Sequence, residues 1–355
     1  MNFDYNEEQQ LLADSVRRFL ADKYSFEHRK KIVDGEGWSP RVWKSFAEMG
    51  LMGLPLPAEH GGFGGAAVDL MGVMEAFGEA LVVEPYLPNV IAARLVARSG
   101  SDAQKSAILP AVADGSMRLA FAHDEKGARY RLDHVNVKAD NGSLKGEKAA
   151  VVGAPVADKL VVSARTAKGI ELFLVDNVQA TGHRTLDGML AADVVLNGAQ
   201  GEPLAGGLAA IEEAVDFATA LVCAEAVGAM KFACDTTLEY LKTRKQFGVP
   251  IGTFQALQHR MVEMFIAYEQ AKSMACLACS KIDAAESAPD RARSVSMAKV
   301  KIADSARHVS QESVQLHGGM GMTEELKVSH TFRRLTVAAR QFGDADHHLA
   351  RLAAL

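Results

Sequence analysis

Apolar residues recur at a helical period at both ends of the chain, and a different pattern lies between them. Up to about residue 117 they follow spacings of three and four residues, which is typical of amphipathic helices. From residue 118 the chain changes to short runs rich in Val, Leu and Phe that Gly, Asn and Asp separate, which is typical of antiparallel strands. The helical period returns near residue 207 and continues almost to residue 355.

This order predicts an α+β protein of three domains. They are an N-terminal helical domain, a middle antiparallel β-barrel or sandwich, and a C-terminal four-helix bundle, over residues 1–117, 118–206 and 207–355. Within the bundle we expect helices over roughly 208–242, 254–283, 289–314 and 324–337. The first of these is longer than a typical globular helix, and such a length suits a bundle.

Composition excludes several classes of partner. The net charge of −5 gives no reason to expect the basic surface that binds nucleic acid. No apolar run approaches the roughly 20 residues that span a bilayer. The N-terminus, MNFDYNEEQQLL, lacks the basic start and apolar block of a signal peptide. We therefore expect a cytoplasmic protein that binds neither nucleic acid nor membrane.

The four cysteines do not predict a metal or redox site. Cys276 and Cys279 form a C-x-x-C inside a helical pattern, whereas a redox pair favours a helix N-terminus. Cys223 and Cys234 lie far apart among Ala and Val, so they do not supply the second close pair that a zinc site needs. We expect four small buried residues and no metal.

A sharp break between two predicted helices gathers polar side chains. Gly248 and Pro250 end the first helix because proline cannot extend it, and Thr253 is predicted to cap the second. One face of that second helix carries Phe254, Leu257, Met261 and Phe265. The break holds close together side chains suited to an anion or a planar heterocycle, namely Arg244, Gln246, Phe247 and Gln255. Spacing alone favours an ordinary solvent-exposed corner.

A glycine-rich segment, QLHGGMG, follows a later helical run. Gly318, Gly319 and Gly321 can form a C-terminal cap and turn. They can also let a ligand approach bare backbone amides closely, as a pyrophosphate or an adenine needs. Spacing alone favours the turn.

Both segments resemble motifs of the acyl-CoA dehydrogenase family. TRKQFGVPIGTFQALQ is similar to its C-terminal signature, and FAEMGLMGLPLPAEHGGFGG to its first helical domain, so the resemblance covers essentially the whole chain. It implies FAD as the cofactor, with the arginine segment binding the FAD of a neighbouring subunit. The residues that match FAD-binding positions are Arg244, Gln246, Phe247, Gln255, Gln315, Gly318, Gly319 and Gly321.

The resemblance also implies a reaction in lipid β-oxidation, the α,β-desaturation of an acyl-CoA. A glutamate removes the α-proton, the flavin takes a hydride, and an electron-transferring flavoprotein receives the electrons. In most of the family this glutamate lies in a Tyr-Glu-Gly-Thr phrase, and Phe342 occupies its position here. Some members place the base on the long helix before the arginine motif, where this chain has Ala218. Asp344 and Asp216 lie two residues from these positions.

Asp344 and Asp346 have three alternative roles. Asp344 has the chemistry of a substitute base, although its side chain is shorter than that of glutamate. It can instead cap the last helix. Family positions just after the base touch the flavin, so both aspartates can do the same. A cap or a flavin contact is favoured over catalysis.

The predicted β-domain departs from the family. The family's Thr-Glu-Pro phrase corresponds here to His123-Asp-Glu-Lys126, and its Trp-Ile-Thr or Trp-Ile-Ser phrase corresponds to Ala150-Val-Val152. These replacements remove an aromatic face and a hydroxyl group. These departures resemble the small subunits of bacterial heteromeric acyl-CoA dehydrogenases that lack the catalytic glutamate, such as the pimeloyl-CoA dehydrogenase small subunit. The resemblance implies a homo-oligomer or an α2β2 heterotetramer with a larger subunit that supplies the base. The alternative is a non-catalytic structural or binding protein that has lost flavin and activity.

Overall fold

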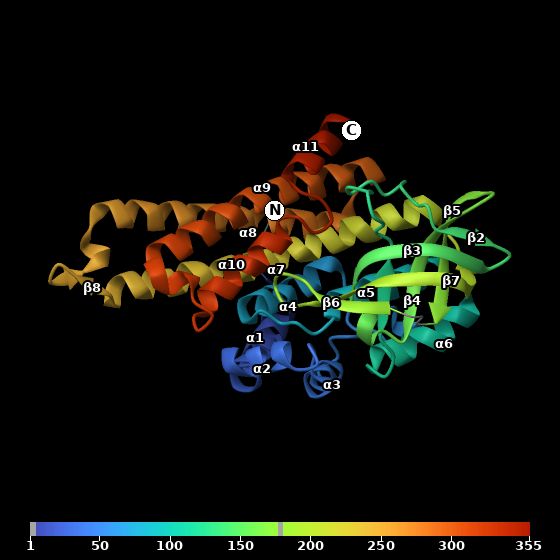
Figure 1. Cartoon of the computed structure of the whole chain (residues 1–355), viewed down its shortest axis with the longest axis horizontal. Helices are drawn as coiled ribbons and strands as arrows, with labels where there is room; N and C mark the ends of the chain where they lie inside the picture. The colour runs from blue at the N-terminus through green and yellow to red at the C-terminus, as the bar shows by residue number, and fades with distance from the viewer. Residues whose placement is uncertain (1–4, 177–179) are drawn as a thin grey trace. The chain divides into compact units, whose positions relative to one another are not determined.

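A computed structural model describes residues 5–176 and 180–355 (Figure 1). The chain divides into two compact units, each built from separate parts of the sequence. The helical unit comprises Met1–Lys30, Ala67–Val82 and Thr219–Leu355, and the mixed unit comprises Lys31–Ala66 and Val83–Ala218. This division groups residues by their contacts in space, whereas the three predicted domains are continuous ranges of the sequence. The three domains therefore stay a prediction.

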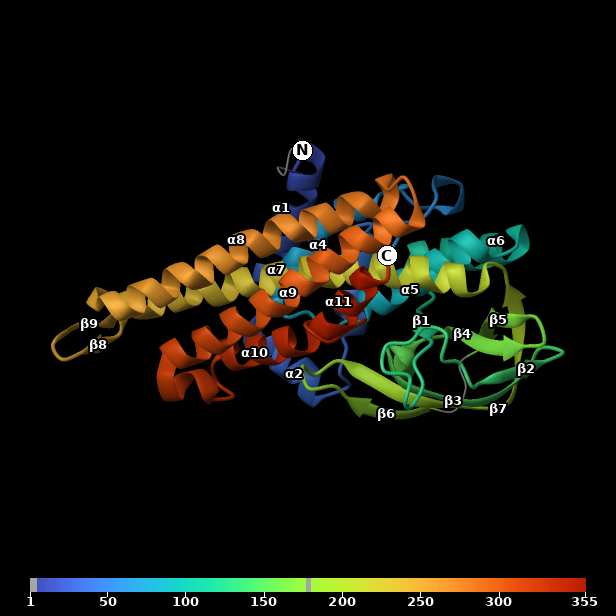
Figure 2. The same ribbon diagram turned by 90° about the horizontal axis from the view of Figure 1, so that it is seen from above.

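The helical unit is built from long helices that pack lengthwise. It contains α1 (Glu7–Lys23), α4 (Ala67–Ala80), most of α7 (Gly207–Thr243), α8 (Gln255–Ala284), α9 (Ala288–His317), α10 (Lys327–Ala338) and α11 (Ala345–Ala353). α8 and α9 run alongside each other, and α9 also contacts α10 and α11 (Figures 1 and 2). The four predicted bundle helices are confirmed, with their ends moved by no more than three residues.

Two glycines let α4 and α7 touch backbone to backbone. A Cβ added to Gly78 would lie 1.8 Å from the carbonyl oxygen of Glu225, and one added to Gly228 would lie 1.8 Å from that of Glu75. No other residue fits at either position without separating the helices.

Short elements connect the helices of this unit. They are the hairpin strands β8 (Lys245–Gln246) and β9 (Val249–Pro250) and the 3-10 turns η3 (Ile251–Thr253) and η4 (Gly318–Met322). The prediction that Thr253 caps α8 is wrong. Its hydroxyl instead donates to the carbonyl of Pro250 at 2.7 Å within η3, and α8 begins after Phe254 without a side-chain cap.

The mixed unit combines a barrel with short helices. Its helices are α3 (Pro40–Glu48), α5 (Tyr86–Ser99) and α6 (Asp102–Ala113), with the 3-10 turns η1 (Ala58–His60) and η2 (Ala154–Val156), while α2 (Phe26–Asp34) and α7 continue into it. Its strands are β1 (Leu119–Ala122), β2 (Lys138–Asp140), β3 (Ser143–Val152), β4 (Lys159–Thr166), β5 (Gly169–Asp176), β6 (Ala180–Arg184) and β7 (Leu190–Leu204).

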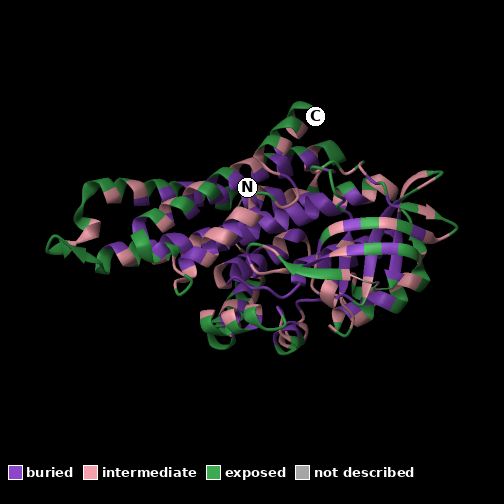
Figure 3. Ribbon diagram, viewed as in Figure 1, coloured by how far each residue is buried: buried purple, intermediate pink, exposed green. Residues whose placement is uncertain are grey.

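The sheet closes on itself. Its strands pair in the order β4–β2–β3–β7–β5, and β5 pairs back to β4, with β1 beside β4 and β6 beside β7. The expectation of purely antiparallel strands is wrong for two pairings, because β1 and β2 both run parallel to β4. Alternate side chains such as Leu160, Val162 and Ala164 are buried in its interior. Figure 3 colours the ribbon by burial and shows buried and exposed positions along the strands.

By length and composition, α7 is apolar enough to cross a membrane, which the sequence pattern did not lead us to expect. It contains an 18-residue stretch with a mean hydropathy of 1.5, but 89% of that stretch is buried inside the protein. Buried core helices of soluble proteins can be equally long and apolar, so packing explains the apolar composition of α7.

Candidate cofactor site

The chain between α7 and α8 forms a short hairpin, which we call the arm (residues 244–254; Figure 2). β8 and β9 pair across a two-residue turn made of Phe247 and Gly248. Both turn residues have positive φ, +52° and +81°, as a type I′ hairpin turn requires. Phe247 adopts this conformation without being glycine, is 92% exposed, and meets the ring of Phe254 edge-on at 6.1 Å.

The arm and the first residue of α8 present the polar side chains that the sequence gathers at the break. Arg244, Gln246 and Gln255 are all exposed. The backbone N–H of Arg244 donates to Tyr240 and its carbonyl accepts from Ile251, both at 2.8 Å, so the base of the arm is fixed. Over residues 5–176 and 180–355, the Arg244 guanidinium has no ion pair or hydrogen bond. An exposed guanidinium on a fixed backbone suits an anion supplied from outside the chain.

The predicted glycine turn is η4. Gly318 has φ +60° and ψ −144°, which glycine alone adopts easily. A Cβ added to Gly318 or Gly319 would meet no atom within 4 Å, so their backbone borders open space. Gly321 is buried, and its added Cβ would lie 2.6 Å from the carbonyl of Val314. Gln315 is exposed on the last turn of α9. The segment is therefore both a helix-ending turn and a stretch of accessible backbone.

The turn between α10 and α11 occupies the predicted base position. Phe342 is half-buried with φ +60°, and Gly343 follows with φ +116°. The Lys299 ammonium, from α9, donates to the carbonyl of Gln341 at 2.8 Å. The His348 Nε2 atom lies 3.1 Å from the carbonyl of Phe342, and because a carbonyl only accepts, this nitrogen carries the proton. The turn is held from two sides in a strained conformation.

Burial controls the charge of both groups that hold this turn. Lys299 is fully buried, and burial lowers its pKa to about 8. Burial, with Lys299 nearby, lowers the pKa of His348 to about 3. At neutral pH the imidazole is therefore uncharged and the ammonium is mostly charged.

The aspartates near the two possible base positions lie in different surroundings. The Asp344 carboxylate accepts the N–H of His347 at 2.9 Å and caps α11. Asp346 is exposed in the first turn of that helix. Ala218 and Asp216 are fully buried in α7. The structure thus assigns Asp344 a capping role and does not bring it to the arm or to η4 by any contact recorded among the described residues.

A buried polar network includes the stretch His123-Asp-Glu-Lys126, which corresponds to the family's Thr-Glu-Pro phrase. Lys148 is fully buried and donates to Glu125 at 2.8 Å, Ser163 at 2.9 Å and the carbonyl of His123 at 3.0 Å. Burial lowers the pKa of Lys148 to about 8 and that of His123 to about 3. The three bonds satisfy the buried ammonium and fix β1, β3 and β4 together.

The second departing stretch lies at an irregularity in β3. The register of β3 shifts between Lys148 and Val151, and Ala150 has φ +51°. The N–H of Ala150 donates to the Asp193 carboxylate at 2.9 Å. Neither Ala150 nor Val152 carries an aromatic ring, so these two positions offer no aromatic face.

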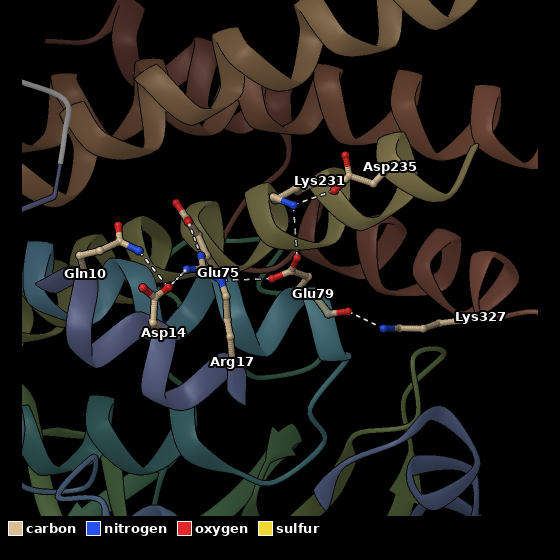
Figure 4. Close-up of polar contacts among 8 residues, drawn as sticks. All are labelled: Gln10, Asp14, Arg17, Glu75, Glu79, Lys231, Asp235 and Lys327. Atoms are coloured by element: carbon tan, nitrogen blue, oxygen red, sulfur yellow. Dashed lines mark hydrogen bonds and ion pairs between the residues drawn. The ribbon is translucent and has the colours of Figure 1, made fainter. Parts of the chain in front are cut away.

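A polar cluster across four helices was not predicted (Figure 4). Arg17 lies 3.3 Å from both Glu75 and Glu79, and Lys231 lies 3.5 Å from Glu79. Lys327 donates to the carbonyl of Glu79 at 2.6 Å. Burial raises the pKa of Glu75. These contacts tie α1, α4, α7 and α10 together and belong to the scaffold.

Lys299 and Lys148 were not predicted from the sequence, and only Lys299 has a feature in the sequence that could have identified it. Lys299 occupies the apolar stripe of α9, between the buried Val295 and Ile302, so its helical spacing marks a buried charge that needs partners. We found no such signal for Lys148, which follows an ordinary strand pattern.

The cysteine and metal predictions can be compared with the described residues. All four cysteines are free and buried, as predicted. Within residues 5–176 and 180–355, no group of three His, Cys, Asp or Glu side chains is arranged to hold a metal ion.

Two family models match this sequence. One, described as "Acyl-CoA dehydrogenase, N-terminal domain", matches residues 6–116, and the other, "Acyl-CoA dehydrogenase, C-terminal domain", matches residues 205–354. The chain is also 30% identical, over 369 residues, to a 3-(aryl)acrylate reductase from Clostridium sporogenes, with 96% of each chain covered.

Solved structures share the fold over the whole length. The ChsE4-ChsE5 complex from Mycobacterium tuberculosis matches with a TM-score of 0.92 and 26% identity, covering 100% of this chain and 98% of that one. The Tcur3481-Tcur3483 steroid ACAD matches with a TM-score of 0.91 and 28% identity, covering 98% of this chain and 97% of that one.

Proposed function

We propose a function for this chain from one premise: it belongs to the acyl-CoA dehydrogenase family. We infer that it is a FAD-binding subunit of an enzyme that desaturates an acyl-CoA between its α and β carbons. A larger partner subunit supplies the base, in an α2β2 assembly, and an electron-transferring flavoprotein accepts the electrons. The likeness to the ChsE4-ChsE5 complex, which joins two differently named chains, supports the heteromeric assembly.

The residues of the helical unit fit the nucleotide end of FAD. Arg244 offers a cation with no partner among the described residues, and Gly318 and Gly319 border open space. Charged donors and bare amides of this kind suit a pyrophosphate, and the exposed Phe247 can cover a planar ring. We assign Gln246, Gln255 and Gln315 as further hydrogen-bonding groups to this end, because all three are exposed.

FAD, when bound, would supply the oxidant for the hydride that leaves the Cβ–H bond. The role of this chain is to bind and orient the cofactor, because the arm and η4 hold the nucleotide end of FAD. The turn at residues 341–344 offers the thioester no proton acceptor. Phe342 is an apolar ring, and the Asp344 carboxylate is engaged by a backbone N–H. Removal of the α-proton therefore falls to another subunit.

The turn at Phe342 is the observation that carries this proposal. A chain that performed the reaction alone would need a carboxylate there or at Ala218, and both side chains are apolar. Lys299 and His348 hold the turn rigidly, so a carboxylate cannot easily be brought in from Asp344 without breaking the cap of α11.

One observation favours a second function. Ala150 and Val152 carry no aromatic ring at the two positions that match the family's tryptophan phrase, which suits a non-catalytic structural or binding protein that holds no flavin. The colour of the purified protein separates the two, because oxidised flavin is yellow. A colourless protein that takes up no added FAD, with or without a partner, would favour the non-catalytic function.

The experiment is co-expression with the product of the adjacent gene. We expect the two proteins to purify together, and acyl-CoA turnover with an electron-transferring flavoprotein to require both. Because relatives include a reductase, the assay should follow both acyl-CoA oxidation and enoyl-CoA reduction. Full turnover by this chain alone would refute the shared site.

A further inference from the structure

Two aromatic rings stack where α7 and α9 end. Tyr240 lies near the end of α7, and His317 is the last residue of α9. Their ring centroids are 4.4 Å apart with an interplanar angle of 29°. One turn earlier the same two helices are joined by a hydrogen bond between the hydroxyls of Thr237 and Ser313, at 2.8 Å. The two layers fix the register of the helix ends.

Hydrogen bonding fixes the orientation and charge of the imidazole. His317 Nδ1 lies 2.8 Å from the carbonyl of Ser313, so Nδ1 carries the proton and donates it. Burial lowers the pKa of His317, which keeps the ring neutral at pH 7. A neutral imidazole that its own helix holds in place is a rigid surface for the Tyr240 ring.

The stack lies at the root of both candidate nucleotide-binding segments. The carbonyl of Tyr240 accepts the N–H of Arg244 at 2.8 Å, so Tyr240 is bonded directly to the base of the arm. His317 precedes Gly318, and a Cβ added to Gly321 would lie 3.1 Å from the Cβ of His317, so η4 packs back onto this residue.

We propose that Tyr240 and His317 are positioning residues that set the distance between the arm and η4. This inference rests on the proposed function, in which one FAD nucleotide end contacts both segments. Neither ring touches the cofactor. Each acts through its neighbour, Tyr240 through Arg244 and His317 through Gly318, and loss of the stack lets the two segments move independently.

The test measures how tightly the full chain binds FAD, with quenching of flavin fluorescence as the signal. Tyr240→Leu should weaken FAD binding by about five- to tenfold, because it removes the ring pair and the spacing that it sets. Tyr240→Phe keeps the ring and should bind FAD as the wild type does. Phe26→Leu is the matched control, because Phe26 meets His330 edge-on at 4.8 Å in the same unit but away from the arm.

A double variant separates positioning from general stabilisation. If the stack positions Arg244, adding Arg244→Ala to Tyr240→Leu should cost much less affinity than Arg244→Ala alone. Additive losses, or a loss in Phe26→Leu as large as that in Tyr240→Leu, would overturn the inference. Wild-type affinity in Arg244→Ala, or no FAD binding by the wild type with or without its partner subunit, would instead refute the proposed nucleotide site itself. Thermal melts of every variant show which proteins are folded.

Discussion

At the scale of single residues, two buried lysines hold neighbouring elements of this protein together. Lys148 and Lys299 are fully buried, and each satisfies its ammonium with carbonyl, carboxylate or hydroxyl oxygens. Burial lowers the pKa of both to about 8, below the ordinary value of 10.5. Burial of the two charged ammonium groups therefore costs free energy at neutral pH, and this cost depends on pH.

Lys299 should make stability rise with pH in the alkaline range. Below pH 8 the amine is charged in both states, and above 10.5 it is neutral in both, so only the unfolded chain binds its proton between these values. The free energy of unfolding of the wild type, relative to Lys299→Met, should therefore rise by about 3 kcal/mol from pH 8 to pH 10.5. Urea titrations at several pH values measure it. A difference that does not change with pH would contradict the assignment.

Asp344 provides a second residue-level prediction. Its carboxylate accepts the N–H of His347 at the start of α11. Asparagine caps helices about as well as aspartate, whereas alanine does not. Asp344→Asn should leave the free energy of unfolding unchanged, and Asp344→Ala should lower it by about 1 kcal/mol. Equal losses in both variants would show that the charge, and not the cap, is what the fold uses.

Arg244 is the residue on which the proposed nucleotide site depends. Its backbone is fixed at the base of the arm, and its guanidinium has no recorded partner in the described chain. Arg244→Ala should release FAD while the helices stay folded, because an anion loses a charged donor. The ratio of flavin to protein absorbance measures occupancy, and circular dichroism checks the fold. Arg340→Ala, which removes an exposed arginine elsewhere in the unit, is the control.

At the scale of elements, helical period and strand alternation predicted much of the fold. The long helices and the barrel follow from these patterns, because each buries one face of a regular element. The parallel pairings of β1 and β2 with β4 could not be predicted, since pairing depends on contacts distant in sequence. The Thr253 cap failed because the hydroxyl found a closer local acceptor, the carbonyl of Pro250.

The candidate site was predicted unevenly for the same reason. Arg244, Phe247 and the glycines belong to contiguous motifs, so the sequence alone locates them on one arm and one turn. Tyr240 and His317 meet only because two helix ends lie together, and neither residue has a local signal.

α8 presents an apolar face that its own chain leaves exposed. Helical spacing grouped Phe265 with Met261, but Met261 is buried and Phe265 is exposed, beside the exposed Val262 and Ile266. Side chains of this size normally meet a partner surface, so we expect a dimer or larger assembly. Figure 3 shows the alternation of buried and exposed residues along this helix.

Light scattering tests the oligomer. The wild type should have at least twice the mass of one chain, and Phe265→Glu should shift it towards the monomer, because burial of an unpaired charge is costly. Gln270→Glu, an exposed polar position on the same helix, should change nothing. A wild-type protein that stays monomeric at all concentrations would count decisively against an oligomer.

At the scale of the whole molecule, this chain combines the segments that we propose bind the FAD nucleotide with an apolar residue, Phe342, at the position proposed for the base. Loss of a positioned general base typically costs about 10²–10⁴ in rate. The isolated chain should therefore desaturate acyl-CoA poorly, and a larger partner that carries a glutamate should restore activity. Phe342→Glu in this chain should then matter little to the complex.

The most direct measurement is the bleaching of bound flavin by acyl-CoA under anaerobic conditions. The isolated chain, loaded with FAD, is mixed with a panel of thioesters from short chains to dicarboxylic and steroid acyl groups, and so is its complex with the partner. We predict slow or no bleaching by the isolated chain and rapid bleaching by the complex. Rapid bleaching by the isolated chain that Asp344→Asn abolishes would show that the base lies in this subunit.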